Sequence, residues 1–430
     1  MIDPELGFTS NVIKDPKRFV GRTALIQSCI NAVNSPNGLI TIYGKRGVGK
    51  SSLLRQIQQI ALGDYLLVQN SGLNHVIPKR PRKYLTVYYQ CDSIISNATD
   101  LLSRLCNDQN DEDGLLRLVP DDGKSIIEFT RSKEVSAGAD LKVINWGAKG
   151  LESTKYAKVV PGDIVQTFRN FVNSIVTHQV KNRMKRDALL ILLDEFDVIQ
   201  NKDGIGSLIK SLSSNEVKFA VCGIGRDISS LVEDHGSIER LLEHGSLFVS
   251  RMSNPEAEAI MNRAEELFEG AVKFATNVKS EIVRIAEGYP YFVQMMGKEC
   301  VAEADRAKAT FIDKIILGTV LDNIRRGKCF PTLETTYQRA IGNSEDRQLL
   351  LHLLADQEEN NTLFTEDVGR VYLKKARKDA TGFDIKNLDQ NLPRLLEKKY
   401  GPILEKIDDR PGVYEFVNPI FRLYVRLRNF

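Results

Sequence analysis

Residues 44–51 read GKRGVGKS and satisfy the pattern G-x-x-x-x-G-K-[ST]. They follow an apolar run at 38–44 that predicts a buried strand, and they lead into a helical pattern at 50–62. In that setting the glycines let backbone N–H groups close around phosphate oxygens, and the helix start adds positive dipole. The alternative is a glycine turn that arose by chance. Such a turn would require neither the strand before it nor the helix after it. This phosphate loop (residues 44–51) therefore predicts a nucleotide site on an α/β fold.

Two side chains of the phosphate loop are expected to carry its chemistry. Lys50 should reach the β- and γ-phosphates of ATP, and the Ser51 hydroxyl should bind Mg²⁺. The rest of the expected nucleotide-binding set here comprises Gly44, Lys45, Arg46, Gly47, Val48, Gly49 and Ser52.

Further apolar runs predict the other strands of a sheet. They lie at 84–89, 188–193, 217–222 and 247–249. Helical patterns alternate with these runs, at 23–34, 50–62 and 163–181. Apolar strands that alternate with helices favour a parallel sheet with helices on both faces.

The run at 188–193 leads directly into three acidic residues, Asp194, Glu195 and Asp197. A buried strand would carry Asp194 to the carboxyl edge of the sheet, where ligands bind in such folds. There Asp194 can hold Mg²⁺ through a water molecule, and Glu195 can accept a proton from an attacking water. The alternative for either acid is a helix cap or an ion pair with lysine. Asp197 is expected to be structural.

Residues 110–160 are expected to form an insertion between the second and third strands. Side chains at 141–147 alternate between apolar and polar, with glycines nearby, which predicts a β-hairpin. This hairpin would carry Trp146, the only tryptophan of the chain. It either packs on the sheet edge or contacts a partner, and both interpretations stay open.

The second half of the chain has a different pattern, helical from 254 to about 330. Later helical patterns at 345–354, 367–376 and 385–398 precede two extended runs joined by a turn. Three helices followed by a β-hairpin is the order of a winged helix. We therefore expect three domains: a core at 1–253, a helical lid at 254–330 and a winged-helix domain at 335–430.

Composition restricts the partners and the compartment. The formal net charge of +3 over 430 residues does not by itself indicate nucleic acid or an anionic membrane. No apolar run approaches the roughly 20 residues that span a bilayer, and the sequence begins without a signal-peptide pattern. The six cysteines form no CxxC pair, which predicts reduced core thiols in a cytoplasmic protein.

The phosphate loop and Asp194, in this order, resemble the AAA+ and STAND branches of the P-loop ATPases, of a prokaryotic kind. Residues 19–22 read FVGR and match an element that lies against adenine in those families. The resemblance thus implies that Val20 and Arg22 contact the nucleotide. Residues 288–290 read GYP and match the G-x-P element of STAND lids, which implies Pro290, followed by Tyr291, at the base.

The resemblance also implies roles for arginines that follow the fourth strand. Arg226 stands where STAND ATPases usually direct an arginine at the γ-phosphate, whereas AAA+ proteins usually have Asn or Thr there. Arg240 is the candidate for an arginine that completes a neighbouring subunit's site, with Arg251 as the second candidate. An ordinary surface arginine is the alternative at each position.

With these features the chain resembles a slow or regulated ATPase that works as a nucleotide-driven switch of STAND type. This implies ATP or ADP with Mg²⁺, self-association in the ATP state, and a separate effector or regulatory protein, in bacterial signalling or antiphage defence. A first alternative is a DNA-binding AAA+ initiator, loader or transposition regulator. A second is a slow structural ATPase of a complex.

The charge pattern of the expected winged helix leaves DNA binding open. Acidic residues accompany the lysines and arginines at 385–398, and a denser basic cluster lies at 374–378. A helix that reads DNA should present a basic face. A winged helix can equally contact a protein or inhibit its own chain, and the fold does not decide between them.

Overall fold

The structure is a computed structural model of the chain. It describes residues 2–35, 38–107, 114–115, 118, 142–145, 155–158, 164–225, 245–356, 370–372, 385–407 and 411–428.

Five strands form a central sheet in the order β2-β5-β6-β1-β7, and all neighbouring strands run parallel. Their bounds are β1 (Leu39–Gly44), β2 (Tyr84–Gln90), β5 (Ala188–Asp194), β6 (Val217–Ile224) and β7 (Ser246–Phe248). The predicted parallel α/β fold is therefore confirmed, and each predicted strand is present to within two residues of its bounds.

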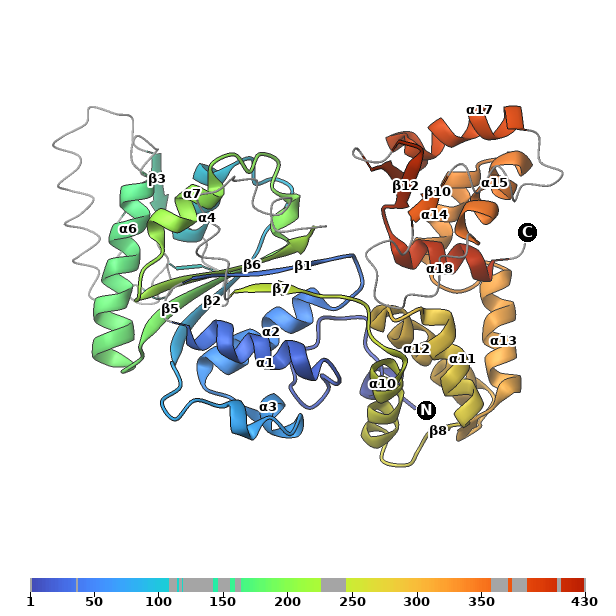
Figure 1. Cartoon of the computed structure of the whole chain (residues 1–430), viewed down its shortest axis with the longest axis horizontal. Coiled ribbons are helices and arrows are strands. Elements are labelled where there is room, and N and C mark those ends of the chain that lie inside the picture. Colours follow the sequence, from blue (N-terminus) through green and yellow to red (C-terminus); the bar gives the residue numbers. More distant parts are fainter. Residues whose placement is uncertain are drawn as a thin grey trace.

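Helices cover both faces of this sheet (Figure 1). One face carries α1 (Thr23–Asn34), α2 (Lys50–Leu62) and α3 (Leu66–Asn70). The other carries α4 (Ala98–Asn107), α6 (Ile164–Ile175) and α7 (Ile205–Leu212). Side chains of β5 alternate between two apolar clusters, with Leu190 and Leu192 in one and Leu189 and Ile191 in the other. Because both faces of β5 are covered, every residue of the strand is buried.

Two predictions for the core are modified. The helix predicted at 163–181 is α6 followed by a π-helical segment, Val176–Arg183. In the expected insertion, β3 (Lys142–Asn145) and β4 (Lys155–Lys158) pair antiparallel, which confirms a hairpin. Trp146 lies outside the described residues, so its predicted place in the hairpin stays a prediction.

A helical region follows the sheet. It consists of α10 (Asn254–Leu267), α11 (Thr276–Ala286), α12 (Pro290–Arg306), α13 (Lys314–Arg325) and α14 (Pro331–Ile341). Two short parallel strands, β8 (Lys273–Phe274) and β9 (Phe311–Ile312), interrupt it. Pro290 is the first residue of α12, where its missing N–H costs nothing. Helix α14 crosses the predicted boundary at 330–335.

We call residues 345–428 the C-terminal segment. It contains α15 (Glu345–Ala355), β10 (Arg370–Tyr372), α17 (Ile385–Leu396), β11 (Leu404–Lys406), β12 (Val413–Phe416) and α18 (Pro419–Leu427). Strands β10, β12 and β11 form an antiparallel sheet in that order. The predicted first and third helices and the hairpin are confirmed, while a winged helix remains an interpretation of this arrangement.

The helix predicted at 367–376 is wrong in its described part, because Arg370–Tyr372 is strand β10. Val371 pairs with Tyr414, and Tyr372 pairs with Val413. This backbone pairing with a strand of the folded domain outweighs the local helical period.

The cysteines agree with the expectation of core thiols. All six cysteines are buried and free. In the described part of the chain, no helix has the length and apolar character needed to cross a membrane.

Candidate nucleotide-binding site

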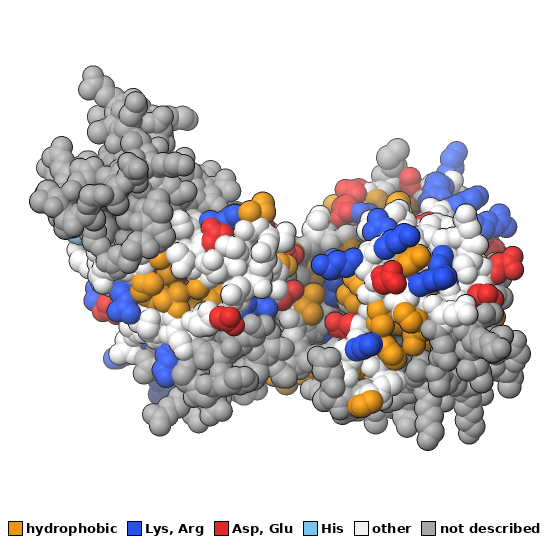
Figure 2. All heavy atoms as spheres, turned by 90° about the horizontal axis from the view of Figure 1, so that it is seen from above, with side chains coloured by type: hydrophobic (Ala, Val, Ile, Leu, Met, Phe, Trp, Pro, Cys, Tyr) orange, Lys and Arg blue, Asp and Glu red, His pale blue; other side chains and the backbone are white. Residues whose placement is uncertain are grey.

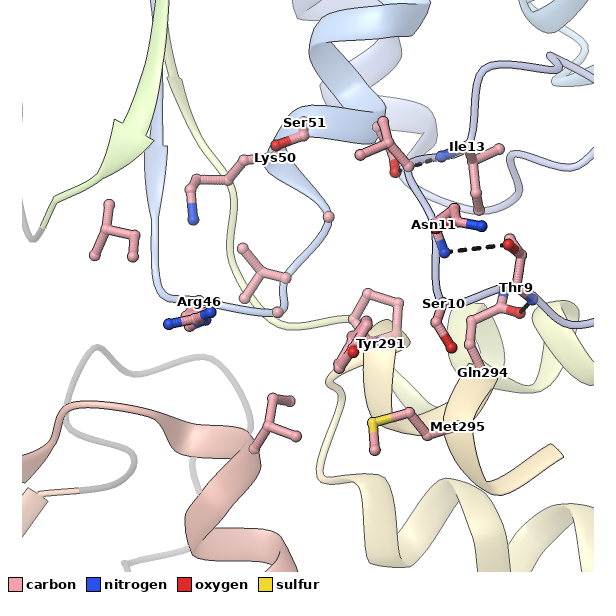
Figure 3. A pocket seen from close by; sticks show the side chains of 18 of the residues that line it. Thr9, Ser10, Asn11, Ile13, Arg46, Lys50, Ser51, Tyr291, Gln294 and Met295 are labelled. Atoms are coloured by element: carbon pink, nitrogen blue, oxygen red, sulfur yellow. Dashed lines mark hydrogen bonds between the residues drawn. The ribbon is translucent and has the colours of Figure 1, made fainter. Parts of the chain in front are cut away.

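A cavity of about 750 Å³ lies beside the phosphate loop, between the core, the helical region and the C-terminal segment. Its lining includes residues 46–52 and 9–13 of the core, with Asp194 and Glu195. The helical region adds Pro290, Tyr291, Gln294 and Met295, and the C-terminal segment adds Asn418 and Ile420. Figure 3 shows the labelled side chains of loop and helix around this space. The volume is that of a small-molecule site.

The phosphate loop connects β1 to α2 as predicted. Gly49 has φ of 96°, a left-handed conformation that glycine adopts without strain, and it caps the start of α2. Lys50 is only 9% exposed and its ammonium donates to the carbonyl of Lys45 at 2.8 Å. Burial lowers the pKa of Lys50. A phosphate in the cavity would offset this cost by supplying a negative charge.

Ser51 and Asp194 are brought together, as a shared magnesium site requires. The Ser51 hydroxyl donates to Asp194 Oδ1 at 3.1 Å, and Asp194 is 4% exposed at the end of β5. A hydroxyl and one carboxylate suit Mg²⁺, which takes few protein oxygens and completes its shell with water and phosphate oxygens. The residues present therefore fit the predicted ion.

The other two acids at this edge of the sheet, Glu195 and Asp197, have different surroundings. Glu195 is exposed, has φ of 53° and occupies the N-cap position of the 3-10 turn Phe196–Val198, but its side chain makes no capping hydrogen bond. It lines the cavity, where a water-activating base would have to be. The Asp197 carboxylate accepts from the N–H of Ile224 at 2.7 Å and so fixes the end of β6. This agrees with the structural role predicted for Asp197.

Arg22 connects the phosphate loop to the helical region. Its guanidinium donates to the carbonyl of Val48 at 2.7 Å, and its N–H donates to Glu256 Oε1 at 2.6 Å. Burial lowers the pKa of Arg22 to about 10, opposed by the charge of Glu256. Val20 and Arg22 both line the cavity. The hydrogen bonds of Arg22 go to protein atoms, so they do not direct its guanidinium toward a nucleotide base.

The residues predicted at 288–291 meet the phosphate loop directly. The N–H of Tyr291 donates to the carbonyl of Gly47 at 3.4 Å. Gly288 has φ of 78°, and a Cβ there would lie 2.4 Å from the carbonyl oxygen of Met252. The turn before α12 therefore requires glycine, which explains that part of the G-x-P element without a ligand.

The C-terminal segment also reaches the phosphate loop, and no sequence pattern indicated it. Lys45 forms an ion pair with Glu415 of β12, whose side chain is 6% exposed. Ile420 of α18 packs on Gly47, where a Cβ would lie 2.8 Å from Ile420 Cδ1. Such contacts join residues about 370 positions apart, so only the folded chain reveals them.

Residues 9–13 also line the cavity, although the sequence did not predict them there. The N–H of Thr9 donates to Gln294 Oε1 at 2.8 Å, and the N–H of Ile13 donates to Ser52 Oγ at 3.0 Å. These bonds fix the segment along the cavity between α2 and α12 (Figure 3). The segment has no helical or alternating pattern, so the sequence gives no local signal for it.

Of the three arginines predicted to act after the fourth strand, Arg251 alone lies among the described residues. Arg226 and Arg240 lie outside the described residues, as does the basic cluster at 374–378. Arg251 is half-buried and donates to the carbonyl of Glu287 at 3.0 Å, so it is not an ordinary surface arginine.

The surface of the C-terminal lobe bears on the DNA alternative. Figure 2 shows Lys and Arg side chains over the lobe formed by the helical region and the C-terminal segment, with Asp and Glu among them. On the described part of the face in view, charges of both signs are therefore mixed. This surface does not single out nucleic acid as a partner.

The parallel sheet, the phosphate loop after β1 and the acid at the end of β5 define the fold of AAA+ P-loop ATPase cores. Residues 18–217 match a family model described as AAA ATPase domain. The match includes the phosphate loop and Asp194 but ends before Arg226. No curated protein was found to match the chain.

Several solved structures are distantly similar. The Thermotoga maritima RuvB Holliday junction branch migration motor is 12% identical, with 95% of this chain and 96% of that chain covered and a TM-score of 0.41. The Aeropyrum pernix ORC1 protein in complex with DNA is 10% identical, with 97% and 93% covered and a TM-score of 0.45. Cdc6p from Pyrobaculum aerophilum is 12% identical, with 99% and 97% covered and a TM-score of 0.41.

Proposed function

We propose that the chain is an ATP-binding and ATP-hydrolysing switch of STAND/AAA+ type, in which the nucleotide controls how the C-terminal segment is held. The observation that carries this proposal is the ion pair between Lys45 of the phosphate loop and Glu415 of the C-terminal segment. This charge pair joins the expected phosphate site to a strand about 370 positions later in the chain.

Electrostatics explains why phosphates should act on this pair. Glu415 is 5% exposed, and a buried carboxylate is costly unless it keeps a partner. The phosphates of ATP bring negative charge to the same loop, compete for Lys45 and repel Glu415. Two unit charges 4 Å apart interact by about 4 kcal/mol at an effective dielectric constant of 20. That is enough to shift a two-state equilibrium by several hundredfold.

The helical region gives the nucleotide a second route to the C-terminal segment. Tyr291 contacts the phosphate loop at Gly47. At the other end of the same turn, Glu287 pairs with Arg422 at 2.8 Å and also with Arg426, both on α18. Any shift of this turn on binding ATP therefore moves the acceptor of two α18 arginines.

The remaining roles follow the expected chemistry of the site. Lys50 and Arg226 would contact the γ-phosphate, Ser51 and Asp194 would hold Mg²⁺, and Glu195 would activate water. Mg²⁺ supplies charge neutralisation of the phosphates when bound. In the ATP state we propose self-association, with Arg240 completing a neighbour's site and a separate effector protein as the output.

A neutral replacement of Glu415 tests the coupling. Glu415→Gln keeps the shape but removes the competitor for Lys45, so ATP should bind on the order of 10-fold more tightly, equal to about 1.4 kcal/mol. ADP, with one phosphate fewer, should gain less. Isothermal titration of both nucleotides gives the two constants.

Matched controls separate coupling from loss of the fold. Glu397→Gln makes the same change at an exposed position of the C-terminal segment and should leave both affinities unchanged. Lys50→Ala should abolish nucleotide binding. Equal affinities for wild type and Glu415→Gln would contradict the switch, and ATP-dependent, salt-sensitive DNA binding would favour the initiator alternative instead.

A further inference from the structure

Tyr88 makes a polar contact with the magnesium-site acid that the proposed chemistry does not use. It lies on β2, the edge strand that pairs with β5, and it is 3% exposed. Its hydroxyl donates to Asp194 Oδ2. The register places Tyr88 opposite Leu192, so the phenol reaches along the sheet toward its carboxyl edge.

This contact adds a donor at the second carboxylate oxygen of Asp194. Oδ1 accepts from Ser51 Oγ at 3.1 Å and from the N–H of Glu195 at 2.9 Å. Tyr88 occupies the other oxygen. A carboxylate held at both oxygens cannot rotate freely, so the lone pairs left on it point in fixed directions.

A side chain of α2 holds the ring of Tyr88 in place. The Arg55 guanidinium lies 3.2 Å from the centroid of the Tyr88 ring. Arg55 also donates to Gln58 Oε1 at 3.1 Å, and Gln58 donates to Thr86 Oγ1 on β2 at 3.2 Å. A cation over the ring is attracted to its π face and makes the hydroxyl a stronger donor.

We propose that Tyr88 is a positioning residue for magnesium, which orients the Asp194 carboxylate toward the ion that accompanies the nucleotide. This inference rests on the proposed function only in taking the phosphate loop as a nucleotide site. Arg55 acts one step further away by holding the ring, and it lies one helical turn after Ser51 on α2. Helix α2 thus carries Ser51, an expected ion ligand, and also Arg55, which holds the tyrosine that orients Asp194.

The expected effect is specific to the metal. Partners that hydrogen-bond to metal ligands typically change metal affinity about 10- to 100-fold when removed. Tyr88→Phe deletes the donor and keeps the ring under Arg55. It should weaken the tightening of nucleotide binding by Mg²⁺ about 10-fold and leave nucleotide affinity in EDTA unchanged.

A second tyrosine of the same strand provides the control. Tyr84 is fully buried on the same face of β2, and its hydroxyl donates to the carbonyl of Val33 at 2.7 Å. Tyr84→Phe removes an equally buried hydroxyl far from Asp194. It should leave the magnesium dependence at the wild-type value, even if the variant melts at a lower temperature.

The experiment titrates a fluorescent ADP analogue into each protein with EDTA and with increasing Mg²⁺. A magnesium-specific loss in Tyr88→Phe alone supports the inference. Equal magnesium dependence in Tyr88→Phe and Tyr84→Phe overturns it but leaves the proposed function standing. If the wild type binds no nucleotide at all, the proposed function itself fails. Should Tyr88→Phe not fold, Arg55→Gln replaces it, with the same specific loss expected.

Discussion

At the scale of single residues, three buried cations have different surroundings. The Arg22 guanidinium donates to the carbonyl of Val48 in the phosphate loop, and its backbone N–H donates to Glu256, whereas Lys50 faces the cavity where phosphate is expected. Lys218, on β6, is 3% exposed and donates to the carbonyls of Ala32 and Ser35, far from that cavity. The three buried cations therefore differ in what they contact. Arg22 links the phosphate loop to the helical region, Lys50 lines the expected phosphate site, and Lys218 anchors the C-terminal end of α1.

The buried ammonium of Lys218 should make the free energy of unfolding depend on pH. Burial lowers its pKa from 10.5 to about 7 in the folded protein. Between these two values the unfolded chain binds more protons, so stability should rise with pH. The free energy of unfolding should rise by on the order of 2 kcal/mol between pH 7 and 9 relative to Lys218→Met. Urea unfolding at both pH values measures this, and parallel profiles would contradict it.

Residue spacing predicted part of the site and missed another part. Lys50, Ser51 and Asp194 belong to short patterns whose flanking strand and helix are legible in the sequence, and they do come together. Tyr88 and Glu415 contact partners 106 and 370 positions away in the chain, Asp194 and Lys45. No local pattern encodes such pairs, so only the folded chain could reveal them.

At the scale of elements, strands and helices with a long apolar period were predictable and short segments were not. The bounds of α1 and α2 agree with the predicted 23–34 and 50–62. Strand β10 has three residues and depends on β12 for its hydrogen bonds, so its sequence alone favoured a helix. Tertiary pairing decides the state of such segments.

The start of α10 predicts a measurable element-scale effect. Ser253 and Glu256 form a capping box, and Glu256 also accepts the N–H of Arg22. Glu256→Ala should lower the free energy of unfolding by about 1–2 kcal/mol, because it removes both a cap and a bond to the core. Glu258→Ala, a half-buried acid of the same turn, should cost clearly less. Equal losses in urea denaturation would argue against this role.

At the scale of the whole molecule, three parts of the chain meet at the phosphate loop. The core supplies the loop, Tyr291 touches it from the helical region, and Glu415 and Ile420 reach it from the C-terminal segment. Glu287 joins the last two parts through Arg422 and Arg426. A change at the phosphates therefore has short physical routes to α18, as a two-state switch requires.

The distance between the core and the C-terminal segment in each nucleotide state tests this account most directly. Dyes attached through Asp203→Cys and Glu397→Cys, both exposed positions, report that distance by energy transfer. We predict different transfer efficiencies with ATP and with ADP, and no difference between them when Lys50→Ala is added. Identical efficiencies with ATP, with ADP and without nucleotide, in a protein shown to bind both, would contradict the proposed switch.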